Sequence, residues 1–66
     1  MDRIEFYGGT RGLLTVVKSA MVPPLGAMVS IEGMRWKVIS VTYAVDNSDA
    51  PKGEQVMRAN VDVEQA

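Results

Sequence analysis

The sequence contains neither cysteine nor histidine. Without cysteine no disulfide can hold the fold, and without either residue type the usual structural zinc site is excluded. The serines have no histidine to activate them, which excludes a Ser-His-Asp triad. Asp46 and Asp49 share a polar stretch, but its spacing differs from that of a calcium loop and favours a solvated turn. We therefore expect no enzymatic activity, no metal and no cofactor.

Excess charge and long apolar runs are also missing. Seven Lys and Arg residues against eight Asp and Glu give a net charge of −1, with no basic or acidic block. The longest apolar stretch, Ala20 to Val29, is interrupted by Pro23, Pro24 and Gly26 and is about half of the roughly 20 residues that a membrane helix needs. No apolar signal-peptide region follows the N-terminus. These features predict a cytoplasmic protein that does not bind membranes.

What the sequence does have is 47% hydrophobic residues in a chain of 66. That is enough for one small core, so residues 1–66 are expected to form a single domain. A chain this short reaches only marginal stability through its own packing. Burial against a protein partner or against further copies of the chain is therefore expected.

The first part of the chain predicts a β-hairpin. Residues 3–7 alternate around Ile4 and Phe6, and residues 13–17 are again rich in strand-forming side chains. The turn is either the tight Gly8-Gly9 pair or the whole loop of residues 8–12. This loop lacks the Lys-Ser/Thr pair of a phosphate-binding loop, which favours a simple turn. If it binds an anion, Arg11 is the residue expected to contact it.

The middle of the chain predicts a second hairpin, over residues 28–32 and 35–45, with Gly33-Met34 at the centre of a type II′ turn. Trp36 and Val38 stand at alternate positions and so lie on one face of the long strand. The apolar residues that follow them fall on the other: Ile39, Val41, Tyr43 and Val45. This change predicts a bulge or bend near residues 38–39. Trp36 and Tyr43 are expected in the core, because large aromatics supply much of a small core.

A fifth strand is predicted over residues 54–64, after a polar turn at residues 46–53. Its alternation points one set of side chains inward, namely Met57, Ala59, Val61 and Val63. Residues 18–27 form a long connection, because Pro23, Pro24 and Gly26 disfavour helix and central strand alike. No segment has the period of an amphipathic helix. The fold class expected is all-β.

Five short strands, a long connection after the second and a meander of the last three are similar to the small five-stranded SH3-like barrel class. An OB-like barrel is the runner-up, although OB-folds usually have a helix between strands three and four, for which this chain has no room. The stretch P-P-L-G-A-M-V-S-I-E-G-M-R-W-K-V-I-S-V, from Pro23 to Val41, also resembles short barrel proteins encoded by bacteriophages. That resemblance implies a protein that acts by binding, in the host cytoplasm or in the virion.

Two surfaces are candidates for function. The first is the apolar, proline-stiffened segment of Met21, Val22, Pro23, Pro24 and Leu25, which either docks a protein partner at low entropic cost or caps the open end of the barrel. The second is a set of basic residues for nucleic acid, namely Arg3, Arg11, Arg35 and Lys37, although acidic residues lie close by in the sequence. The leading hypothesis is a non-enzymatic protein-interaction module, and the alternative is a small nucleic-acid-binding barrel.

Overall fold

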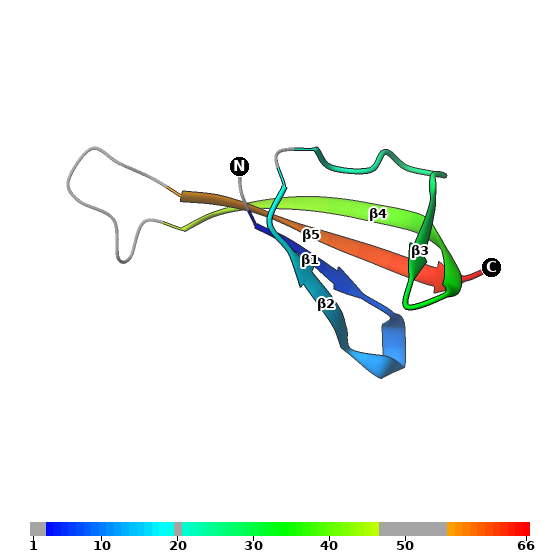
Figure 1. The fold of residues 1–66 in the computed structure, drawn as a ribbon. Coiled ribbons are helices and arrows are strands. Elements are labelled where there is room, and N and C mark those ends of the chain that lie inside the picture. The colour runs from blue at the N-terminus through cyan, green and yellow to red at the C-terminus, as the bar shows by residue number, and fades with distance from the viewer. Residues whose placement is uncertain (1–2, 20, 47–55) are drawn as a thin grey trace.

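The computed structural model describes residues 3–19, 21–46 and 56–66, and these segments form an all-β fold (Figure 1). The strands are β1 (Ile4–Tyr7), β2 (Leu13–Val17), β3 (Met28–Ile31), β4 (Met34–Asp46) and β5 (Val56–Gln65). A short 3₁₀ turn, η1 (Gly9–Arg11), joins β1 to β2. The expected class and the five strands are therefore confirmed. In the described segments, no helix has the length and apolar character that a membrane crossing needs.

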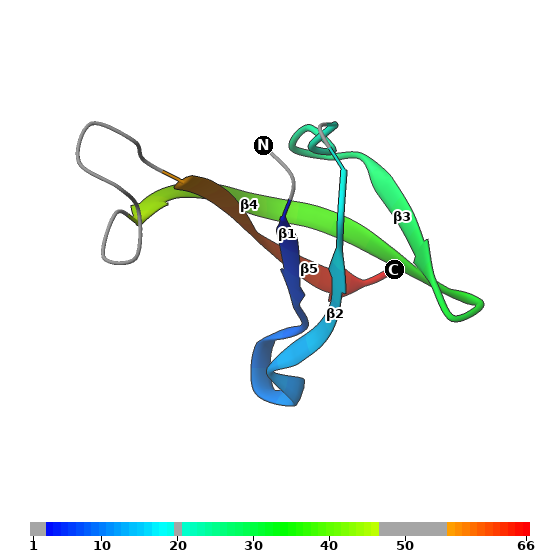
Figure 2. The ribbon, with the colours of Figure 1, turned by 60° about the vertical axis from the view of Figure 1, so that its left-hand side comes forward.

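The strands form one mixed sheet in the order β2-β1-β5-β4-β3. β1 runs parallel to β5, and the other neighbours are antiparallel. The sheet curls into a half-barrel, in which β2 and β3 are the two edges (Figure 2). The expectation of a closed barrel is therefore too strong for the described residues. The meander of the last three strands is confirmed. The parallel pairing of β1 with β5 was not predicted, because no sequence pattern indicates it.

The turn between β3 and β4 differs from the predicted one. Ile31 pairs with Met34, so Glu32 and Gly33 are the two central residues. Both have positive φ, 51° at Glu32 and 82° at Gly33, as a type I′ turn requires. The prediction of a type II′ turn centred on Gly33-Met34 was wrong by one residue. Gly33 adopts this conformation without steric cost, which explains why the chain reverses here.

A bulge in β4 confirms the predicted change of parity. Val38 pairs with Val63 and Ser40 with Asp62, which leaves Ile39 unpaired between them. The extra residue brings Trp36, Val38 and Val41 onto the same side of the strand. One long strand therefore keeps its apolar side chains on the concave face along the curl.

The core lies on the concave face, which we call the inner face. Its buried side chains come from β1, β4 and β5: Ile4, Phe6, Trp36, Val38, Ala59, Val61 and Val63. The expectation for Trp36 is confirmed, since only 4% of it is exposed. The expectation for Tyr43 was wrong, because 54% of it is exposed. Met57 lies opposite Val45 and is also largely exposed, at 43%.

The two connections in the first half of the chain follow the predictions. The first hairpin uses the longer loop, in which Gly8 N–H donates to Gly12 O at 2.9 Å. The long connection contains neither helix nor strand in its described residues, 18–19 and 21–27. The predicted polar turn lies outside the described residues from 47 to 53, and with it Asp49, as does the predicted start of the last strand at residues 54–55.

Candidate functional site

The main candidate site is the gap between the two edges of the half-barrel, which we call the edge groove. It is a cavity of about 450 Å³ that opens between β2 and β3. Ile4 and Phe6 lie at its floor and remain nearly buried. The groove is lined mainly by apolar side chains of β2, the long connection and β3, which include Val17, Met21, Pro23, Val29 and Ile31. A curved sheet with an unfilled apolar gap is suited to binding another protein segment.

The predicted docking segment, residues 21–25, forms part of one wall of this groove. Met21 N–H donates to Ser19 Oγ at 3.0 Å, and Ala27 N–H donates to Pro24 O at 3.1 Å. Gly26, next to the segment, is bound to β4, because its N–H donates to Val38 O at 2.9 Å. These bonds order the backbone of the segment at both ends. Little conformational entropy remains to be lost when a partner binds there.

The sequence left two roles open for this segment, docking a partner and capping the core, and its side chains divide between them. Met21 is 83% exposed and Leu25 67% exposed. Val22, in contrast, packs against the core. Pro23 faces the groove and Pro24 is exposed. Val22 therefore belongs to a cap over the core, whereas Met21 and Leu25 present apolar surface to solvent.

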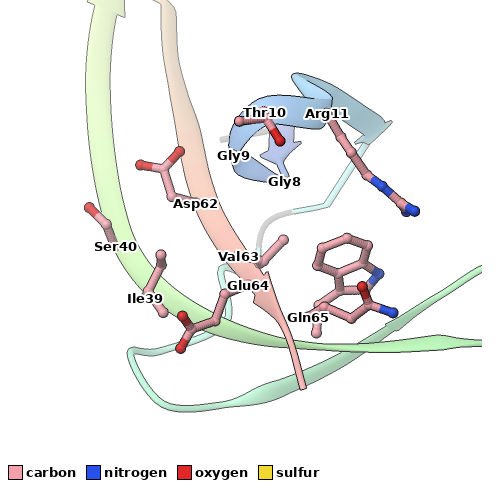
Figure 3. A pocket seen from close by; sticks show the side chains of 11 residues that line it. Gly8, Gly9, Thr10, Arg11, Ile39, Ser40, Asp62, Val63, Glu64 and Gln65 are labelled. Atoms are coloured by element: carbon pink, nitrogen blue, oxygen red, sulfur yellow. The ribbon is translucent and has the colours of Figure 1, made fainter.

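A second cavity, of about 510 Å³, lies between the η1 loop and the β4–β5 pair at the bulge (Figure 3). The Arg11 guanidinium lies over the Trp36 ring, 5.7 Å from its centroid. This cation–π contact holds the η1 loop on the core. Figure 3 shows Asp62 and Glu64 of β5 at the other side of the cavity. The sequence had suggested Arg11 as an anion contact, and the structure gives it an aromatic neighbour.

The opposite, outer face of the sheet carries a polar cluster around Glu5, which is only 5% exposed. Arg3 Nε donates to Glu5 Oε2 at 2.8 Å, and the Tyr7 hydroxyl donates to Glu5 Oε1. The hydrogen bond from Tyr7, and then the bond and charge of Arg3, hold the pKa of Glu5 below its ordinary value of 4.5, although burial opposes the shift. The same bond to Glu5 raises the pKa of Tyr7 above 10.0.

Arg58 and Asn60 of β5 complete this outer surface. Asn60 lies beside Glu5 in the β1–β5 register, and the charge of Arg58 also lowers the pKa of Glu5. Arg58 Nε and Asn60 Oδ1 are buried and have no hydrogen-bond partner in the described part of the chain. Sequence reasoning missed this cluster. The only signal was the alternation of Arg3, Glu5 and Tyr7 on one side of β1.

The basic residues proposed for nucleic acid do not share one free surface. Arg3 is engaged with Glu5, and Arg11 covers Trp36. Arg35 and Lys37 project from the outer face of β4, where Lys37 lies opposite Glu64. Arg3 and Lys37 therefore each have an acidic residue beside them.

The chain has no match among protein-family models, curated proteins or solved structures. Within the described segments, no group of three or more acidic side chains is placed to hold a metal ion. Any function assigned to the chain therefore depends on its own residues and geometry.

Proposed function

We propose that this chain is a non-enzymatic protein-interaction module that binds a protein partner at the edge groove. One observation carries the proposal: the sheet stops at half a barrel, and apolar side chains line the gap between β2 and β3. The exposed Met21 at the wall of the groove extends this apolar surface outward. Methionine adapts its shape to irregular partner surfaces, which suits it to this position.

We also propose that the half-barrel belongs to the SH3-like class. The long connection before β3 and the β3–β4–β5 meander support this assignment. The two-residue turn between β3 and β4 leaves no place for the helix of an OB-like barrel. The resemblance of residues 23–41 to phage-encoded barrels supports a role as a virion component or as a host-factor-binding protein.

The test is affinity capture from the native host, followed by mass spectrometry, with three versions of the chain. Met21→Ser with Leu25→Ser removes the two most exposed large apolar side chains of the segment, of which Met21 lines the groove, and both are exposed enough for the fold to survive. Val45→Ser is the matched control, because Val45 is 58% exposed but lies on the far part of β4. We expect a protein that the wild type and the control retain and that the double variant loses.

Circular dichroism of each variant shows whether the fold is intact. Loss of the fold in the double variant would assign the segment to the cap and remove support for docking. Light scattering on the purified chain tests whether the partner is a further copy. A strictly monomeric chain that retains no protein would contradict the proposal.

A further inference from the structure

We infer that β2 receives the partner as an added β-strand, and that the partner segment is apolar with an acidic residue at each end. This inference rests on the proposed function and specifies the chemistry of the partner. The first observation is the open edge of β2. Among the described residues β2 pairs only with β1, so one side of its backbone is open to another strand.

The side chains of β2 do not protect this edge. Natural edge strands usually carry charges or proline that prevent another strand from adding. The sequence of β2, Leu-Leu-Thr-Val-Val, has neither. Leu13, Val16 and Val17 are 51%, 42% and 39% exposed. The irregularity in the β1–β2 register affects only the Leu14 end, and residues 15–17 continue as a regular strand.

A strand added to β2 would occupy the edge groove. Thr15 and Val17 line the groove, together with Ile4 and Phe6 of the neighbouring strand. Because side chains alternate along a strand, every second side chain of the added segment would point into the cavity. Backbone hydrogen bonds would then provide affinity and the apolar cavity would provide selectivity, as in other cases of β-strand addition.

Charge determines which segment fits best. Lys18 follows β2 directly and the strand itself is uncharged, whereas Arg11, before the strand, is held over the Trp36 ring. A partner with an acidic residue at each end would place one of them beside Lys18 in either strand direction. Glu32, at the end of β3, lines the opposite side of the groove, so β3 is less suited to a segment with acidic ends.

The same charges disfavour a second copy of the chain. An antiparallel β2–β2 pair centred on Thr15 would put Lys18 of one copy opposite Gly12 of the other. Neither Lys18 would then have an acidic residue across from it, so this pair lacks the opposite charges that favour a different partner. The occupant inferred is therefore a segment of a different protein.

The experiment is an NMR titration of ¹⁵N-labelled protein with two synthetic peptides, Asp-Val-Thr-Val-Thr-Val-Asp and Lys-Val-Thr-Val-Thr-Val-Lys. We expect the acidic peptide to shift the amide signals of Leu13–Val17 and slow their hydrogen exchange. We expect it to bind about tenfold more tightly than the basic peptide at low salt, with a smaller difference at high salt. Lys18→Glu should remove most of this preference.

Two further variants make the result specific. Lys37→Glu makes the same change of charge on the outer face of β4 and should leave the preference unchanged. Val16→Lys places a charge on the exposed edge and should abolish the shifts in β2, since such charges block strand addition. Its amide spectrum without peptide shows whether the fold is intact.

Three results would overturn the inference: equal binding of the two peptides, no change at the β2 amides, or protection of those amides by self-association without peptide. None of them contradicts the proposed function as long as host-partner binding still requires Met21 and Leu25. Loss of that requirement contradicts the proposed function itself, whatever the peptides do.

Discussion

The β4–β5 pair has two halves that carry similar residues and differ in burial. In the half next to β1, Ala59, Val61 and Val63 are between 0% and 2% exposed. In the half beyond β1, Val45 and Met57 pair with each other on the same inner face and are 58% and 43% exposed, and Tyr43, opposite Ala59 at the boundary, is 54% exposed. The difference comes from β1, whose pairing with β5 covers only residues 59–62.

This contrast shows that alternation specifies a face but not whether that face is covered. Both halves place apolar side chains at every second position, and only one of them contacts a third strand. A two-stranded ribbon has marginal stability in water unless another element packs on it. The part of the ribbon covered by β1 is therefore expected to provide most of the stability, and the substitutions below test this.

The largest effect is expected from Ile4→Ala in β1. Ile4 is 1% exposed, lies beside Ala59 and belongs to the strand that covers the ribbon. Removing a side chain of this size from a core costs about 2–5 kcal/mol. Urea unfolding followed by the fluorescence of Trp36 measures the change. A loss below about 1 kcal/mol would show that β1 is not the stabilising cover.

The comparison is most direct at two valines. Val61→Ala in the covered half should cost about 2 kcal/mol, from two lost methyl groups and the cavity they leave. Val45→Ala in the uncovered half should stay within about 0.5 kcal/mol of the wild type. The same urea titration serves for both. Equal losses at the two positions would mean that something covers the ribbon in solution.

The outer face of the covered half allows a test by pH. The folded chain lowers the pKa of Glu5, so ionised Glu5 contributes stability above its ordinary value of 4.5, and this contribution is lost as the pH falls through the folded pKa. Tyr7→Phe removes the main cause of the shift. The loss of stability on acidification should therefore be smaller than in the wild type and complete at a higher pH.

The same substitution has an alkaline consequence. The raised pKa of Tyr7 means that its contribution is complete below 10.0 and is lost as the pH rises through the higher folded pKa. Tyr7→Phe should remove this contribution and its loss at alkaline pH. Unfolding free energies measured across the pH range test both effects. Tyr43→Phe, which removes an exposed hydroxyl, is the control, and an identical acid profile for the two variants would contradict the role of Glu5.

The smallest effect is expected from Tyr43→Thr, at the boundary between the two halves, where Tyr43 pairs with Ala59. Tyr43 is more than half exposed, and threonine suits a strand, so the free energy of unfolding should change by less than about 0.5 kcal/mol. A core role for Tyr43, as the sequence suggested, would instead cost several kcal/mol. Thermal unfolding distinguishes the two results.

The sequence predicted what depends on local pattern. The parity change at residues 38–39 correctly located the bulge, and alternation correctly placed Trp36 and Val61 inside. The prediction from sequence failed where the outcome depends on pairing between strands that are distant in the sequence. Nothing in residues 4–7 shows that they pair with residues 59–62, and without that pairing the exposure of Tyr43 and the burial of Glu5 cannot be foreseen.

The candidate site follows the same division. The apolar segment at residues 21–25 could be identified from the sequence, because a proline-stiffened stretch that contains methionine is apparent without knowledge of the fold. The edge groove could not be predicted, since it exists only because β2 and β3 are the two edge strands of an open, curled sheet. The polar cluster was missed for a similar reason, because Asn60 and Arg58 come from the other end of the chain.

The parallel pairing of β1 with β5 also has a consequence for synthesis of the protein. The backbone contact between Arg3 and Ala59 can form only after Ala59 has been synthesised, since Ala59 N–H donates to Arg3 O. Contacts between such distant positions slow folding. Until residues 59–62 have been synthesised, β1 lacks its parallel neighbour, and the apolar side of the first hairpin stays uncovered.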